Sequence, residues 1–308
     1  MKKILVIAAL LGWASTVQAD PTQETVYLPI NGIKIPLHLH IPAKLEGKVP
    51  AVLVVHGSGG ARDTHVGAWA KEFAYMGAIG VVIDFYTPRG VKSTSADQTS
   101  VRYMDNVQES FAALELLAKD LRIDPNRIAI VGFSRGGTIA HDTAYTIYRQ
   151  ISKATTKRSF ALHLAVYPGC NFIPSDTRVT KAPIYIMVGE ADTYSGVENC
   201  RRQFDVLTTR KANVHFVTYP GAKHAWDVIG SASFFYPPAE NWINCLFEHQ
   251  ADGTWKNTRT NETFRNLRSD PKAMACMKRG AELGYNRDMH QKLLQDIKAI
   301  VSKTLVSK

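Results

Sequence analysis

The stretch Arg127-Ile128-Ala129-Ile130-Val131-Gly132-Phe133-Ser134-Arg135-Gly136-Gly137 lies near the middle of the 308-residue chain and decides the fold. An apolar, β-branched run leads into the pattern Gly-x-Ser-x-Gly, and Thr138-Ile139-Ala140-His141 then predicts the start of a helix. Strand, motif and helix in this order are typical of a nucleophile elbow, a sharp turn that exposes a serine hydroxyl. The alternative is an ordinary tight turn with a solvent-facing serine. The close glycines and two partner residues farther along the chain favour the elbow.

A serine nucleophile needs a base, and the base needs a group that orients it. Two polar residues follow later predicted strands in the expected chain order, the acid before the histidine. Asp192 follows a strand predicted over residues 183–188, and His224 follows one predicted over residues 214–219. Both lie past the carboxyl end of a strand, where ligands bind in open α/β sheets. The sequence therefore predicts Ser134 as nucleophile, His224 as base and Asp192 as the orienting acid.

Four other residues compete for the two partner roles: Glu190, Asp84, His215 and His141. Each carboxylate is equally explained as a helix cap or a solvated loop residue, and each histidine as a packed or capping side chain. Asp192 and His224 remain the favoured pair because both follow a strand end.

Acyl transfer also requires hydrogen-bond donors for the oxyanion that develops on the carbonyl. One donor should be the backbone N–H of Arg135, the residue after the nucleophile. The second is expected from His56-Gly57-Ser58-Gly59-Gly60, which follows a strand predicted over residues 50–55. Within it the Ser58 amide is the favoured donor and Gly59 the second. The alternative is an ordinary glycine-rich turn or a phosphate-binding loop, but the segment lacks both the Lys-Ser/Thr ending and the full Gly-x-Gly-x-x-Gly spacing of the latter.

Six short motifs together resemble the dienelactone hydrolase family of the α/β-hydrolase superfamily. They occupy residues 56–60, 84–90, 131–137, 167–170, 189–192 and 221–226. The resemblance implies an α/β-hydrolase fold and cleavage of carboxylic esters or lactones through an acyl-enzyme. The enzymes that gave the family its name use a cysteine nucleophile, whereas this chain has Ser134. That departure favours a general carboxylic ester hydrolase over an enzyme specific for dienelactone.

The pattern along the chain agrees with one large α/β domain. Strand-like runs alternate with helical segments from residue 50 to residue 220, which predicts a mainly parallel sheet with helices on both faces. Residues 25–30 and 33–41 flank Asn31-Gly32 and predict an antiparallel hairpin with a type I′ turn. Residues from about 229 to 285 are expected to form an insertion before a last helix. Its aromatic half either lines the acyl pocket or forms a surface loop.

The N-terminus predicts a signal peptide over residues 1–19, because a basic start and an apolar run precede Val17-Gln18-Ala19. The apolar run is too short to span a membrane, so export to a bacterial periplasm or beyond is expected, without a stable membrane anchor. An oxidising compartment favours disulfides, and four cysteines allow three pairings. Cys170–Cys200 and Cys245–Cys276 are expected because the members of each pair are close in sequence.

Arg89, His56 and Trp226 are candidate substrate contacts, and Arg102 and the Arg135 side chain are further candidates for meeting a substrate carboxylate. No spacing indicates a metal, and no cofactor is expected. The formal net charge of +10 comes without a nucleic-acid-binding motif. A small-molecule ester is therefore the expected partner, and the sequence does not define an oligomeric state. The alternatives are a peptidase of the prolyl-oligopeptidase type and a binding protein that keeps the fold without turnover.

Overall fold

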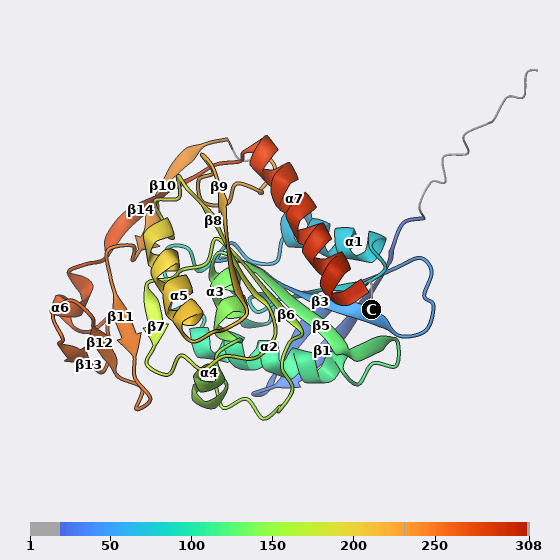
Figure 1. The fold of residues 1–308 in the computed structure, drawn as a ribbon, viewed down its shortest axis with the longest axis horizontal. Coiled ribbons are helices and arrows are strands. Elements are labelled where there is room, and N and C mark those ends of the chain that lie inside the picture. Colours follow the sequence, from blue (N-terminus) through green and yellow to red (C-terminus); the bar gives the residue numbers. More distant parts are fainter. Residues whose placement is uncertain (1–18, 231, 307–308) are drawn as a thin grey trace, which may run out of the picture.

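The computed structural model describes residues 19–230 and 232–306 (Figure 1). The predicted signal peptide falls outside the described residues except for Ala19. The central sheet has eight strands: β1 (Thr22–Ile30), β2 (Ile33–Ile41), β3 (Val49–Val55), β4 (Ile79–Ile83), β5 (Ile123–Phe133), β6 (Leu162–Val166), β8 (Ile184–Gly189) and β9 (Val214–Tyr219). Their order across the sheet is β1-β2-β4-β3-β5-β6-β8-β9. β2 pairs antiparallel with β1 and β4, and all other neighbours are parallel. The predicted α/β class is confirmed.

The hairpin at the start of the sheet follows from its turn residues. Asn31 and Gly32 have φ values of 49° and 78°. A type I′ turn needs positive φ at both central positions, and Asn-Gly adopts that conformation readily. The antiparallel edge predicted from this dipeptide is therefore present.

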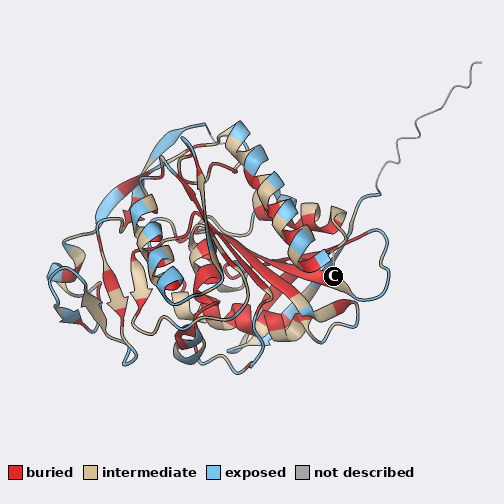
Figure 2. Cartoon of the chain, in the orientation of Figure 1, coloured by how far each residue is buried: buried red, intermediate tan, exposed pale blue. Residues whose placement is uncertain are grey.

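Helices cover both faces of the sheet. The longer helices are α1 (Ala68–Tyr75), α2 (Tyr103–Leu117), α3 (Arg135–Asp142), α5 (Val197–Thr209) and α7 (Arg287–Val301). The short helices are η1 (Asp63–Gly67), η2 (Thr87–Arg89), α4 (Thr146–Ile151), α6 (Pro271–Met274) and η3 (Ser302–Val306). Along β3, Leu53 and Val55 pack into one core with α2 and α4, while Val52 and Val54 pack into another with α1 and α7. Because both faces are covered, the central parallel strands β3 and β4 are apolar throughout. Figure 2 shows these strands as the buried centre of the molecule.

One turn-like sequence lies inside a strand. Asp-Pro-Asn-Arg at residues 124–127 is typical of a turn, but these residues belong to β5, whose pairing with β3 shifts register there. The Asp124 carboxylate accepts a hydrogen bond from the Asn126 amide and forms an ion pair with Arg127. The turn is thus accommodated as a bulge, and β5 continues to the elbow.

Two smaller sheets lie outside the central one. β10 (Phe234–Asn241) and β14 (Lys278–Leu283) form an antiparallel ribbon, and β7 (Phe172–Pro174), β11 (Phe247–His249), β12 (Trp255–Asn257) and β13 (Thr263–Phe264) form the other sheet. We call residues 234–283 the C-terminal segment. Figure 1 shows it at the left edge of the molecule, beyond α5.

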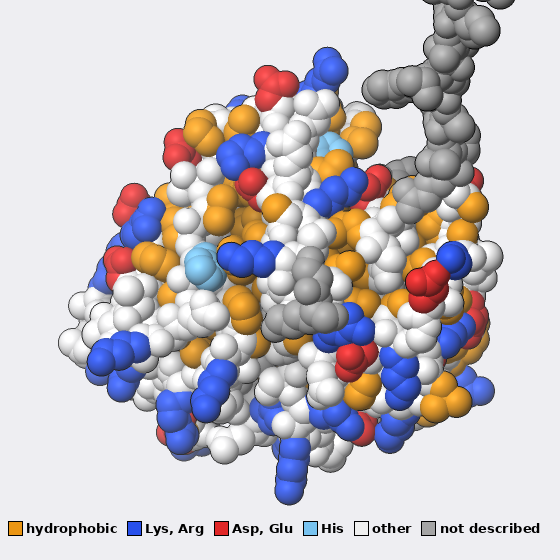
Figure 3. All heavy atoms as spheres, turned by 45° about the vertical axis from the view of Figure 1, so that its right-hand side comes forward, with side chains coloured by type: hydrophobic (Ala, Val, Ile, Leu, Met, Phe, Trp, Pro, Cys, Tyr) orange, Lys and Arg blue, Asp and Glu red, His pale blue; other side chains and the backbone are white. Residues whose placement is uncertain are grey.

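Two disulfides, Cys170–Cys200 and Cys245–Cys276, pair all four cysteines. The first joins the chain after β6 to α5, and the second lies within the C-terminal segment. Within the described residues, no helix is long and apolar enough to cross a bilayer. Lys and Arg side chains are scattered over the face drawn in Figure 3 and do not gather into one patch there.

Candidate active site

Ser134 occupies a sharp turn between β5 and α3. Its φ of 55° and ψ of −119° lie in a region that non-glycine residues rarely adopt, which is the kind of local strain found at functional sites. Its amide donates a hydrogen bond to the Val166 carbonyl at 3.0 Å. The surrounding strand and helix therefore hold the serine in a conformation that the isolated chain would avoid.

The glycines of the motif are required by close packing around this turn. A Cβ on Gly132 would lie 1.9 Å from the Gly136 carbonyl oxygen. A Cβ on Gly136 would lie 2.2 Å from the Val55 oxygen, and one on Gly137 would lie 2.5 Å from the Val166 oxygen. Only glycine lets α3 begin this close to β5, β3 and β6. The sequence motif is thus explained by backbone contacts on three sides.

The residues predicted as partners of Ser134 lie beside it. His224, after β9, has its Nε2 2.8 Å from the Ser134 Oγ and its Nδ1 2.8 Å from Asp192 Oδ2. The other Asp192 oxygen accepts hydrogen bonds from the amides of Tyr194 and Ser195. Burial would raise the pKa of Asp192, but the attraction of His224 and these hydrogen bonds outweigh it and lower the pKa. An ionised Asp192 favours the tautomer in which Nε2 is free to accept the serine proton.

The residues that competed for these roles lie elsewhere. Glu190 is exposed. Asp84 accepts a hydrogen bond from the Tyr86 amide at the start of the short helix η2. His215 stacks on a tyrosine of β8, and His141 is buried in α3. The two carboxylates are thus a solvent-exposed residue and a helix-capping residue, and the two histidines are packed side chains.

The glycine-rich loop after β3 packs directly against the serine. A Cβ on Gly57 would lie 3.2 Å from the Ser134 Cβ. The Ser58 carbonyl accepts a hydrogen bond from the Thr94 amide at 2.9 Å, which holds the loop. In the described part of the chain, no acceptor engages the backbone amides of Ser58 or Arg135. Two amides next to a serine hydroxyl are suited to stabilising an oxyanion. Gly59 lies beside them in the same hollow.

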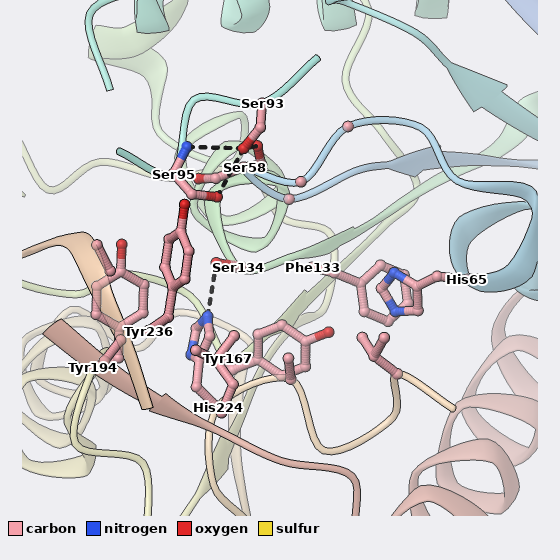
Figure 4. A pocket seen from close by; sticks show the side chains of 18 of the residues that line it. Ser58, His65, Ser93, Ser95, Phe133, Ser134, Tyr167, Tyr194, His224 and Tyr236 are labelled. Carbon is pink, nitrogen blue, oxygen red and sulfur yellow. Dashed lines mark hydrogen bonds between the residues drawn. The ribbon is translucent and has the colours of Figure 1, made fainter. Parts of the chain in front are cut away.

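Two chambers meet at the site, and both are lined by Ser58, Ser134 and Tyr194. The small chamber has a volume of about 390 Å³ and is also lined by His224, and the large chamber has a volume of about 940 Å³. Figure 4 shows the small chamber, with Tyr194 and Tyr236 on one side of the Ser134–His224 contact and Phe133 and His65 on the other. Arg102 and Arg135 line the large chamber.

Three of the residues predicted as substrate contacts line neither chamber. The Arg89 guanidinium pairs with the buried Glu109 carboxylate and donates a hydrogen bond to the Phe85 carbonyl. His56 is 1% exposed and accepts a hydrogen bond from the Phe85 amide, and burial lowers its pKa to about 4. Trp226 is fully buried in the core. All three stabilise the scaffold because the chain packs over them.

A buried carboxylate next to the site was not predicted from the sequence. Asp227 accepts hydrogen bonds from Trp69 Nε1 at 2.9 Å and the Tyr167 hydroxyl at 2.6 Å, and its Oδ2 lies 2.9 Å from His65 Nε2. Burial raises the pKa of Asp227, but His65 and the two donors outweigh this and lower it. The Tyr167 ring packs edge-on against His224, with 4.8 Å between ring centroids. Asp227 thus holds His65 and Tyr167 in place, and both of these residues line the small chamber.

Asp227 follows His224 by three residues, and this proximity was the one available signal. Its three partners come from η1, α1 and the end of β6, so sequence order alone does not bring them together. Among the described residues there is no group of three or more His, Cys, Asp or Glu side chains placed to hold a metal ion.

A mostly parallel sheet with its nucleophile candidate at a strand-to-helix elbow defines an α/β-hydrolase. A model of the dienelactone hydrolase family matches residues 36–239, which is more than half of the sequence. The chain therefore belongs to the dienelactone hydrolase family, and it is a carboxylic ester hydrolase by class.

Solved structures share the fold. Esterase 2 of Thermogutta terrifontis, phosphoramylated by tabun, matches with a TM-score of 0.57 and 18% identity, over 69% of this chain and 88% of the esterase. The dienelactone hydrolase-like promiscuous phosphotriesterase P91, from metagenomic libraries, matches with a TM-score of 0.61 and 14% identity, over 93% of this chain and all of P91.

Among curated proteins, the uncharacterized peptidase YuxL of Bacillus subtilis is 22% identical over 234 residues, covering 66% of this chain and 35% of YuxL. The curated relatives that the chain matches are much longer than it is. It spans between 5% and 36% of their lengths.

Proposed function

We propose that the protein is a serine hydrolase that cleaves carboxylic esters or lactones through an acyl-enzyme intermediate. The observation that supports this most is the continuous contact from Ser134 Oγ through His224 to the Asp192 carboxylate, with 2.8 Å at each step. A serine placed in this way has the base and the orienting acid that nucleophilic attack requires.

In the proposed reaction, His224 Nε2 takes the Ser134 hydroxyl proton as Oγ attacks the carbonyl carbon. The oxyanion then accepts hydrogen bonds from the amides of Ser58 and Arg135. When the tetrahedral intermediate collapses, His224 gives the proton to the leaving oxygen, and the alcohol departs. Water enters, loses a proton to His224 and attacks the acyl-enzyme, which releases the acid and restores Ser134. Asp192 holds the imidazole throughout and stabilises its charged form.

A peptidase is the second candidate, because the chain is similar to part of YuxL, which is named as a peptidase. The same contacts would serve amide cleavage, in which His224 protonates a leaving nitrogen. Comparing p-nitrophenyl esters with p-nitroanilides of the same acyl group separates the two candidates, because only the leaving group differs.

We also propose that the enzyme is exported. Two disulfides in a chain with an apolar, basic-flanked N-terminus are typical of proteins that mature in an oxidising compartment. Retention of both disulfides in periplasmic or secreted protein supports export, and recovery of the reduced protein with its N-terminus intact contradicts it.

The enzymatic proposal is tested with the purified protein against p-nitrophenyl esters of graded acyl length. We expect Ser134→Ala and His224→Ala each to lower kcat by about 10³-fold or more, while the melting temperature stays near that of the unsubstituted protein. Wild-type turnover in Ser134→Ala would contradict the proposal. Folded protein without turnover on any ester or anilide would favour the binding protein.

A further inference from the structure

The large chamber runs along one face of α3. Ser134, Arg135, Thr138 and Asp142 all line it, and their spacing is that of neighbours on one helical face. Eight residues separate Ser134 from Asp142, so the chamber extends about 12 Å along the helix axis at 1.5 Å per residue. The reacting serine lies at one end of this path, and a buried carboxyl group lies at the other.

The position of His224 assigns the two chambers to the two halves of an ester. His224 must donate its proton to the leaving oxygen, so the alcohol lies in the chamber that His224 lines. That chamber is the small one. The acyl group, which stays on Ser134 while the alcohol departs, is left to occupy the large chamber, which His224 does not line.

Aromatic rings form one wall of the large chamber. Phe172 of β7, Trp255 of β12 and Trp242 are each half-buried and line it. The Phe172 ring lies 5.4 Å from the Trp255 ring and 5.8 Å from the Trp242 ring, measured between centroids. Trp255 also stacks on His249 at 3.9 Å, which fixes its plane. Fixed rings that are open on one side bind a planar, apolar group well.

The far end of the chamber is polar. Asp142 is 5% exposed, and its carboxylate accepts a hydrogen bond of 2.8 Å from the Tyr103 hydroxyl. Tyr148, which is 1% exposed, also lines the chamber, and no described residue forms a hydrogen bond with its hydroxyl. Burial raises the pKa of Asp142, although contacts with His141 and Tyr103 oppose the rise. The hydroxyl oxygen is not itself fully buried, so it is open to the chamber, where a ligand or water can form a hydrogen bond with it.

We propose that the large chamber holds the acyl group of the substrate, and that this group is an elongated aromatic acid with a hydroxyl at its far end. The ring lies against Phe172, Trp242 and Trp255, and the hydroxyl meets Asp142 and Tyr148. The small chamber takes a compact alcohol. This inference rests on the proposed serine hydrolase function, because it uses the roles of Ser134 and His224.

Three methyl esters test the acyl group: methyl 4-hydroxycinnamate, methyl cinnamate and methyl 4-methoxycinnamate. The methoxy compound keeps the ring and the oxygen but cannot donate a hydrogen bond. We expect kcat/KM for the hydroxy ester to exceed that of each other ester by about tenfold, the effect of one hydrogen bond to a buried polar group. Equal values, or a preference for methyl octanoate over all three, would overturn the proposal.

Variants at the polar end of the large chamber test which residues cause the preference for the hydroxy ester. Asp142→Asn should reduce the ratio of kcat/KM for the hydroxy ester over the unsubstituted ester to near one. Because Asp142 also supports Tyr103, Tyr148→Phe serves as a second variant that keeps the ring and removes only the hydroxyl, and it should lower the same ratio severalfold. A ratio unchanged in both folded variants would overturn the assignment of the polar end.

Single-turnover kinetics test both the aromatic wall and the orientation of the ester, with its acyl group in the large chamber and its alcohol in the small one. Trp255→Leu should change the deacylation rate of the hydroxycinnamoyl-enzyme, and Tyr236→Leu in the small chamber should change only the dependence of acylation on alcohol size. Tyr27→Leu, an exposed aromatic position in β1, is the matched control and should alter neither. The opposite assignment of effects would overturn the orientation. Ser134-dependent hydrolysis of acetate esters without hydroxyaryl preference defeats this inference alone, whereas no Ser134-dependent hydrolysis defeats the proposed function as well.

Discussion

Replacing Asp192 by asparagine changes one contact of the candidate site and conserves its shape. Asp192 Oδ1 accepts hydrogen bonds from the amides of Tyr194 and Ser195, and an asparagine oxygen can accept both. Its Oδ2 lies 2.8 Å from His224 Nδ1, and there the variant presents an NH₂ group. Two donors cannot share a hydrogen bond, so the variant favours the His224 tautomer with its proton on Nε2. In that tautomer the ring can no longer accept the Ser134 proton.

The expected loss follows from the same geometry. In a serine protease triad, this exchange lowers kcat by about 10⁴-fold, which corresponds to about 5 kcal/mol of transition-state stabilisation. Here the Ser195 hydroxyl lies 3.1 Å from His224 Nδ1 and donates its own proton to the Tyr167 carbonyl, which leaves its oxygen as an acceptor. It can accept the Nδ1 proton in place of the lost carboxylate oxygen. We therefore expect a loss of between about 10³-fold and 10⁴-fold in kcat.

The assay is hydrolysis of p-nitrophenyl acetate by Asp192→Asn, with the melting temperature measured in parallel. Because the two backbone hydrogen bonds are kept, we expect the free energy of unfolding to change by only about 1–2 kcal/mol. Asp192→Asn with Ser195→Ala removes the substitute acceptor and should lose more activity than Asp192→Asn alone. Glu190→Gln is the matched control, since Glu190 is the exposed rival carboxylate.

A folded Asp192→Asn variant with more than a tenth of the original kcat would refute the role of Asp192. A larger loss in Glu190→Gln than in Asp192→Asn would assign the acid to Glu190 instead. Either result would show that the observed contact between Asp192 and His224 does not control the tautomer.

Three further predictions concern stability and the residues around the site. Asp227→Asn should lower the free energy of unfolding by about 1–3 kcal/mol, because its NH₂ group would face a donor in a buried network. It should also reduce kcat/KM; denaturant unfolding measures the first effect and ester kinetics the second. Burial lowers the pKa of His163 to about 4, below about 6.5 for the unfolded chain. The unfolded chain therefore binds the extra proton between these values, and the free energy of unfolding should fall as pH drops from 6.5 to 4, with a smaller slope in His163→Gln. Reducing Cys170–Cys200, which closes a 30-residue separation, should cost about 3–4 kcal/mol and lower activity, as measured by thermal unfolding with and without reductant.

Local features of the structure were predictable from the sequence. The Asn31-Gly32 turn and the glycines around Ser134 leave few backbone solutions, because positive φ and close approach exclude most side chains. The positions of Asp192 and His224 followed from a second regularity, since the carboxyl ends of parallel strands meet at one edge. Neither inference required knowledge of contacts between distant segments.

Features that depend on long-range packing were not predictable. Arg89 lies in a motif near the site, yet its charge is neutralised by Glu109 on the covering helix α2. Trp226 follows His224 by two residues but points into the core instead of the chamber. The large chamber forms where β7 and the C-terminal segment meet α3, and no sequence pattern reports that contact.

The central claim is that Ser134 carries the acyl group, and covalent labelling tests it most directly. A fluorophosphonate should modify the folded protein once, and peptide mass spectrometry should place the adduct on Ser134. Labelling should disappear in Ser134→Ala and slow strongly in His224→Ala, because the base activates the hydroxyl. An adduct on another residue, undiminished labelling of Ser134→Ala, or no labelling of the folded protein would contradict the account.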